Sequence, residues 1–190
     1  MRKLKYYTVI GIFFVVTAGC LAHFMYDWSG QNPVVGMVTP VNESVWEHMK
    51  LLFFPMLVYS GLMVIRFKSQ CTHIASKLCL GILTGTVLIP VLFYAYTFLL
   101  GRNILFIDIV IFVISVIAAC GISYQRILTC KPEPYRVLLY VFTGILAICF
   151  IVFTYHPPVL QLFKTSLMTV SAGSGRSCVS FAFEERLKKV

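Results

Sequence analysis

Charged side chains are scarce in this sequence, and acidic ones most of all. Only 12% of the 190 residues are charged, with 7 Asp and Glu against 16 Lys and Arg. A soluble domain carries about twice that share of charge, which argues against a soluble globular fold. The chain is instead 59% hydrophobic with a mean hydropathy of +0.87, so its surroundings are mostly lipid. The net charge of +9 comes without a basic stripe carrying interleaved aromatics, so nucleic acid is not an expected partner.

Several motifs are missing as well. The sequence holds no HExxH, GxSxG or P-loop pattern and no internal repeat, so no familiar enzyme class is indicated. Its 7 cysteines are odd in number and irregularly spaced, and we predict no disulfide framework. Cys71, His73 and Cys79 form the nearest approach to a cysteine metal site, but they lack a zinc spacing.

Five apolar runs dominate what is present, and each has about the 20 residues that a bilayer requires. We predict an all-α polytopic transmembrane bundle in one domain, residues 1–163. Residues 164–190 form a polar, basic tail that is disordered or atypical. The predicted spans cover about 6–26, 43–67, 75–100, 104–124 and 135–155.

Local signals refine these spans. Ser44 and Glu47 have capping-box spacing at the start of the second span. Pro55 predicts a kink within that span. Gly81 and Gly85 form a small-xxx-small pair in the third span, which predicts a face of close helix contact.

Basic residues predict the orientation. Nine of them precede the first span or flank the loops after the second and fourth spans: Arg2, Lys3, Lys5, Arg66, Lys68, Lys77, Arg126, Lys131 and Arg136. The opposite side has only Lys50 and Arg102 before the tail. The positive-inside rule therefore predicts a multi-pass protein of the cell (cytoplasmic) membrane, with its N-terminus in the cytoplasm and its C-terminus outside.

Antiparallel spans bring alternate helix ends to one side, and most ionisable residues lie there. This polar layer comprises His23, Asp27, Glu43, Glu47, His48, Asp108 and His156, with Asn42, Ser44, Tyr94 and Tyr96 beside them. An ionisable group within a span costs about 2.5–3.5 kcal/mol on insertion scales and is a functional candidate by default. Asp108 has strongly apolar neighbours, so it should face the bundle interior and find a partner there.

Three interpretations of the layer stay open. In one, it is a structural or ligand-binding network, in which Glu47 caps a helix and Asp108 pairs with a Tyr or His. In the second, it belongs to a metal-dependent membrane hydrolase, with Glu47 as general base or fifth ligand. The ligands to zinc or another divalent metal would be His23, His48, Asp108 and His156. In the third, a small transporter or ion-binding protein uses Asp108 and Glu47. The sequence indicates no other cofactor, protein partner or oligomeric state.

Two stretches carry a family resemblance. They read His-Phe-Met-Tyr-Asp-Trp-Ser-Gly at 23–30 and Pro-Val-Asn-Glu-Ser-Val-Trp-Glu-His-Met-Lys at 40–50. The chain resembles, over about 6–163, a family of small bacterial integral membrane proteins of unknown function. The resemblance implies a helical membrane bundle and no particular activity, and the tail departs from the family's usual C-terminus. In site type alone, the layer is also similar to the zinc site of ceramidase and adiponectin-receptor hydrolases.

Overall fold

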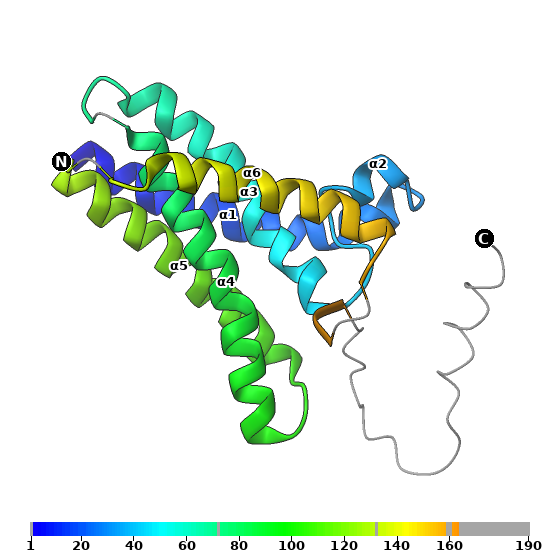
Figure 1. Ribbon diagram of the computed structural model, residues 1–190. Coiled ribbons are helices and arrows are strands. Elements are labelled where there is room, and N and C mark those ends of the chain that lie inside the picture. The colour runs from blue at the N-terminus through cyan, green and yellow to red at the C-terminus, as the bar shows by residue number, and fades with distance from the viewer. Residues whose placement is uncertain (1, 72, 132, 159–160, 164–190) are drawn as a thin grey trace, which may run out of the picture.

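The computed structural model describes residues 2–71, 73–131, 133–158 and 161–163, and throughout these residues every regular element is a helix (Figure 1). The elements are α1 (Arg2–Trp28), α2 (Pro33–Gly36), α3 (Val45–Phe67), α4 (Ile74–Leu100), α5 (Leu105–Thr129), α6 (Arg136–Tyr155) and the 3-10 turn η1 (Gln161–Phe163). The predicted all-α fold is confirmed. The predicted tail, 164–190, lies outside the described residues.

Five helices, α1, α3, α4, α5 and α6, are long and apolar enough to cross a membrane, which confirms the five predicted spans. α1 begins four residues earlier than predicted, and α5 ends five residues later. Both extensions carry polar or basic residues. The helices are longer than predicted because the prediction followed the apolar stretch, and a helix can continue beyond it. The direction in which the bundle is inserted stays a prediction.

The bundle has two ends, which we name by the elements found there. At the "α2 end", α1, α4 and α6 finish while α3 and α5 begin; the N-terminus lies at the opposite, "N-terminal end" (Figure 1). The hairpin of α4 and α5 diverges from α3 and α6 towards its loop at the α2 end. The predicted polar layer therefore corresponds to the α2 end.

α3 is the helix around which the others pack, since it contacts α1, α4, α5 and α6. α4 packs against both α3 and α5. All five long helices contribute fully buried apolar side chains, among them Val15, Leu52, Phe53, Ile82, Val116 and Phe150. Most other large apolar side chains of these helices are exposed on the outside of the bundle, where lipid would cover them.

Two glycines of α4 allow its backbone to lie close to α5. A Cβ added to Gly81 would lie 2.0 Å from Ser123 Oγ and 2.5 Å from the carbonyl oxygen of Ala119. A Cβ added to Gly85 would lie 2.6 Å from Ala119 Cβ. The predicted close-contact face is thus confirmed, and it is the contact with α5.

Candidate functional site at the α2 end

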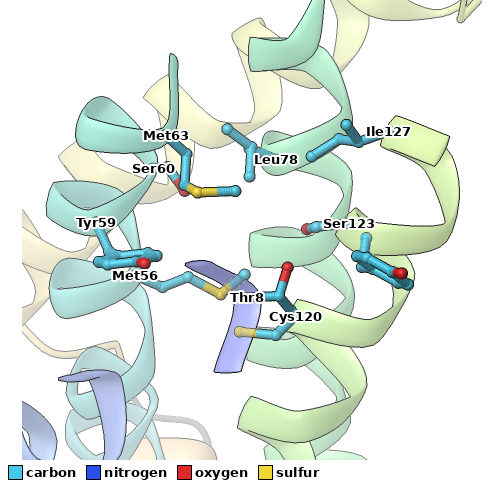
Figure 2. A pocket seen from close by; sticks show the side chains of 10 residues that line it. Thr8, Met56, Tyr59, Ser60, Met63, Leu78, Cys120, Ser123 and Ile127 are labelled. Atoms are coloured by element: carbon cyan, nitrogen blue, oxygen red, sulfur yellow. The ribbon is translucent and has the colours of Figure 1, made fainter. Parts of the chain in front are cut away.

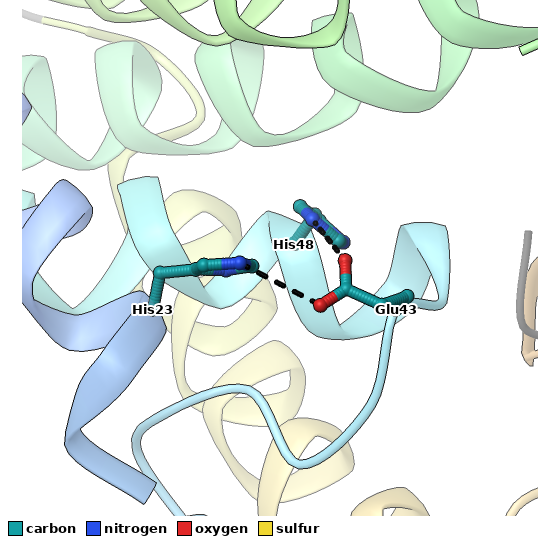
Figure 3. A group of neighbouring side chains, drawn as sticks. All are labelled: His23, Glu43 and His48. Atoms are coloured by element: carbon teal, nitrogen blue, oxygen red, sulfur yellow. Dashed lines mark ion pairs between the residues drawn. The ribbon is translucent and has the colours of Figure 1, made fainter. Parts of the chain in front are cut away.

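His23, Glu43 and His48 converge at the α2 end of the bundle. Each offers one ligand atom, and these atoms all lie within 4.8 Å of one another. His23 comes from α1, His48 from the first turn of α3, and Glu43 from the loop just before α3, as Figure 3 shows. We call these three residues the His-Glu-His cluster.

The close packing of α1 on α3 positions His23. Gly19 lies one helical turn before His23, on the same face of α1. A Cβ at Gly19 would lie 2.7 Å from the carbonyl oxygen of Leu51, so only glycine lets the two helices approach this closely. The Nε2 atom of His23 then lies 3.5 Å from Oε1 of Glu43.

The N-cap of α3 positions Glu43. Ser44 is the N-cap residue, and its hydroxyl accepts a hydrogen bond from the Glu47 backbone N–H at 3.3 Å. The backbone N–H of Ser44 in turn donates to Oδ1 of Asn42 at 2.9 Å. These bonds fix the turn that leads into the helix. The serine half of the predicted capping box is present, but the Glu47 side chain turns elsewhere.

A backbone hydrogen bond orients the His48 ring. Its Nδ1 atom lies 2.9 Å from the carbonyl oxygen of Ser44, and a carbonyl oxygen can only accept, so Nδ1 carries a hydrogen. The other nitrogen, Nε2, points at Oε2 of Glu43 from 3.3 Å. In a neutral ring with this tautomer, Nε2 presents a lone pair to a carboxylate. The arrangement therefore calls for a positive charge at that point, supplied by a proton or by a metal cation.

The cluster is partly exposed. The side chains of His23 and His48 are each 30% exposed, and that of Glu43 is 53% exposed. The hydrogen bond with His48 lowers the pKa of Glu43 below its ordinary value, burial opposes this, and the nearby charges of His48 and His23 lower it further. Within the described residues, the buried Nδ1 atom of His23 has no hydrogen-bond partner.

Asp108, in the first turn of α5, is coupled to the cluster through its charge. Its carboxylate interacts electrostatically with His48 and with Glu43. The hydroxyl of Tyr96 donates a hydrogen bond to Asp108 and also lies within hydrogen-bond distance of Asn103. Asp108 thus has the kind of partner that its apolar surroundings predicted.

Glu47 takes part in a separate, buried network. Its Oε2 atom lies 2.7 Å from Nζ of Lys50 and accepts the backbone N–H of Val41 at 3.0 Å. Lys50 also donates to the carbonyl oxygen of Gly36 at 3.2 Å and to the hydroxyl of Thr154 on α6. The side chains of Lys50 and Glu47 are 0% and 2% exposed. This buried pair joins the α2 segment, α3 and α6.

The remaining predicted residues of the layer lie apart from the cluster. His156 follows the last residue of α6 and is exposed, and Asp27 near the end of α1 is exposed as well. Tyr94 is 38% exposed. Of the four predicted ligands, the structure therefore brings His23 and His48 together, leaves Asp108 in an electrostatic interaction with His48, and leaves His156 outside the group.

Sequence reasoning missed two partners in this region. Lys50 was counted only as a basic residue flanking a span, although its spacing of three residues from Glu47 is a signal for an ion pair on one helix face. Thr154 gave no signal, because it is 104 residues away from Lys50. Glu43 was in the predicted layer, but Glu47 was preferred to it as the acidic partner of the metal.

A small cavity lies in the other half of the bundle, between α1, α3, α4 and α5 (Figure 2). It has a volume of about 20 Å³, which is space for about one water molecule. Its lining includes Met56, Met63, Cys120 and Ser123. It is too small for a substrate, so the His-Glu-His cluster is the better candidate for a functional site.

Residues 1–172 match a family whose description reads "Family of unknown function (DUF6512)". This match covers most of the chain and agrees with the resemblance seen in the sequence. Neither the curated proteins nor the solved structures contain a match to the chain.

Proposed function

We propose that this chain, which belongs to the family of unknown function DUF6512, is a multi-pass membrane protein that binds a divalent transition metal ion, such as zinc. The ligands are His23, Glu43 and His48 at the α2 end. The observation that carries the proposal is the convergence of two imidazoles and one carboxylate from three segments of the chain. Imidazole nitrogens and carboxylate oxygens are ligands that zinc takes in proteins.

The distances in the cluster support a metal ion. A tetrahedral ion with bonds of about 2.0–2.1 Å holds neighbouring ligand atoms about 3.4 Å apart. The two histidines approach different oxygens of Glu43, with His23 Nε2 at 3.5 Å from Oε1 and His48 Nε2 at 3.3 Å from Oε2. With one ligand atom taken from each residue, the three atoms lie within 4.8 Å of one another, so the side chains would have to close in around an ion.

The hydrogen bond from His48 to Ser44 supports the same proposal. Metal-binding histidines usually donate their other ring N–H to a carbonyl or carboxylate, which fixes the tautomer and the ring orientation. His48 does so through Nδ1, which leaves Nε2 as the ligand atom.

The surroundings favour an exposed, chemically open site. Three protein ligands leave one position of a tetrahedral ion for water, as catalytic zinc sites do. The carboxyl group of Asp108 interacts electrostatically with His48 and Glu43, and as a general base it would accept a proton from such a water. This observation favours metal-dependent hydrolysis as a second candidate function. Asp108 would then be the general base, a role that the sequence analysis assigned to Glu47. Glu47 is neutralised by Lys50 and acts as a structural residue.

The proposal includes a location. The surplus of basic residues at the N-terminal end favours a cytoplasmic N-terminus, so the α2 end and its metal lie on the outer side of a bacterial cell membrane. A metal at that end would be taken from outside the cell. The transporter alternative needs a polar path through the bundle, whereas the buried hydroxyls of Thr86 and Thr143 bond to carbonyls of their own helices.

Metal analysis of the purified protein tests the proposal. The full-length chain is purified in detergent through a tag without histidine, loaded with zinc, dialysed and measured by elemental analysis. We expect one zinc per chain in the wild type and affinity losses of at least about 100-fold for His48→Gln and Glu43→Gln, because each removes a ligand.

His156→Gln is the matched control, since it removes an exposed histidine from the same end of the bundle. It should bind zinc like the wild type. A wild-type protein that binds no zinc would refute the proposal. So would a loss in His156→Gln as large as that in His48→Gln, because it would restore the ligand set predicted from the sequence.

A further inference from the structure

A disulfide joins two loops at the N-terminal end of the bundle, although the cysteine spacing predicted none. Cys71 lies in the turn after α3 and Cys130 directly follows α5, with their Cα atoms 5.7 Å apart and a sequence separation of 59. Both loops lie at the end opposite to the His-Glu-His cluster. The disulfide is therefore independent of the proposed metal site.

The two sulfurs of this disulfide differ in their surroundings. Cys71 is 4% exposed, whereas Cys130 is exposed. The ammonium group of Lys77, whose side chain is buried, lies 3.4 Å from Sγ of Cys71. The ammonium group of Lys77 also donates a hydrogen bond to the carbonyl oxygen of Lys131 at 2.8 Å, in the loop that holds Cys130. A cation is thus held against one sulfur of the pair, the buried one.

We propose that Cys71 and Cys130 form a thiol–disulfide exchange site whose substrate is a thiol reductant, with Cys130 as the sulfur attacked and Cys71 as the leaving group. An attacking thiolate needs access to the sulfur, and Cys130 is the exposed residue of the pair, whereas Cys71 is buried. Exchange is also faster when the departing thiolate is stabilised. Lys77 supplies that stabilisation at Cys71 and not at Cys130.

The exchange proceeds in two balanced steps. In the first, a thiolate RS⁻ attacks Sγ of Cys130, the S–S bond breaks, and the products are the mixed disulfide Cys130–S–S–R and the thiolate of Cys71 beside Lys77. In the second, another RS⁻ attacks the mixed disulfide at the sulfur of R. RSSR leaves and the thiolate of Cys130 is released. The chain gains two electrons and the thiol pair is oxidised to a disulfide.

The charge pattern of this end agrees with such a role. Basic residues gather at the N-terminal end, including Arg126 and Arg136, and Arg136 lies 2.8 Å from the His73 ring. The same surplus favours a cytoplasmic location, where thiols are kept reduced and disulfides are mostly catalytic or redox-sensing. Positive charge around the pair also attracts anionic thiolates.

The first test identifies the attacked sulfur. The full-length protein in detergent is exposed briefly to millimolar reduced glutathione, quenched with an alkylating reagent, and digested for peptide mass spectrometry. We expect glutathione on Cys130 and the alkyl group on Cys71. Glutathione mainly on Cys71 would overturn the proposal, as would a disulfide that glutathione leaves intact in the folded protein but reduces after denaturation.

The second test measures the contribution of the ammonium group. Lys77→Met keeps an unbranched side chain of similar length and removes the charge, so reduction by glutathione should slow roughly three- to tenfold. Lys3→Met is the matched control, because it removes an exposed lysine of α1 at the same end and should leave the rate within about twofold. Equal rates in Lys77→Met and wild type would overturn the role of Lys77. If Lys77→Met does not fold, the peptide mapping on the wild type still decides the proposal.

Discussion

Replacing Lys50 with methionine removes the cation from the buried network at the α2 end while keeping an unbranched side chain of similar length. The carboxylate of Glu47 would stay buried, with hydrogen bonds from Val41 and Thr154 but no counter-charge. Breaking a buried ion pair by removing one partner costs about 3–5 kcal/mol, because the remaining charge is left uncompensated. We expect Lys50→Met to lower the free energy of unfolding by about this amount.

The reasoning is checked by titrating the purified protein with SDS in mixed micelles and following its helicity by circular dichroism. Arg126→Met is the matched control, because Arg126 lies 3.8 Å from Glu133 in a pair whose arginine is 55% exposed. Breaking that pair should cost less than about 1 kcal/mol. The double variant Glu47→Gln, Lys50→Met should recover most of the loss, since it removes the buried charge as well.

Two outcomes would refute this account of the network. One is a Lys50→Met variant that is no less stable than Arg126→Met, which would mean that the buried pair contributes no more than a surface pair. The other is a double variant as unstable as the sum of the two single variants. In that case the two side chains would act independently, contrary to their 2.7 Å contact.

Two further predictions concern helix packing and pH. Gly81→Ala should lower the free energy of unfolding by about 1–3 kcal/mol, because its methyl group would lie 2.0 Å from Ser123 Oγ, whereas Gly121→Ala, with no atom within 4 Å of its Cβ, should not destabilise the protein. The same SDS titration checks both variants, and equal effects would contradict the close α4–α5 contact. The pKa of Glu43 in the folded protein is lowered from the ordinary value of 4.5. The interaction of Glu43 with His48 therefore stabilises the fold fully above the unfolded-state pKa, and this stabilisation is lost as the pH falls through the lower folded-state pKa. With a chelator present, wild type should therefore be more stable than Glu43→Gln at pH 6, and this difference should shrink below about pH 4.5; a constant difference would be the contrary result.

The resemblance to an uncharacterised family and the five spans required no tertiary information. A bilayer accepts a helix of about 20 apolar residues, and each of the five runs meets this condition by composition alone. Alternation of antiparallel spans then assigns His23, His48 and Asp108 to one end without any knowledge of packing. The pair Gly81 and Gly85 likewise predicted a close face, because only small residues let helices touch in lipid.

The grouping of the polar side chains depended on the tertiary structure. Glu43 and Glu47 are four residues apart and equally acidic, yet Glu43 meets the two histidines while Glu47 is buried against Lys50. Which of the two glutamates meets the histidines depends on where α3 begins and on how α3 is rotated about its own axis. The contact of α3 with α6 through Thr154 helps to fix this rotation.

The sequence by itself determined the number, approximate bounds and alternation of the helices, since these follow from hydropathy and chain direction. Only the tertiary structure decided the pairings between segments: His23 with Glu43, Lys50 with Thr154, and Cys71 with Cys130. Such pairings require two helices or loops to meet with a particular rotation of each helix about its axis and a particular shift along it. Packing over the whole bundle sets this rotation and shift, and the residues near any one motif contribute little to that packing.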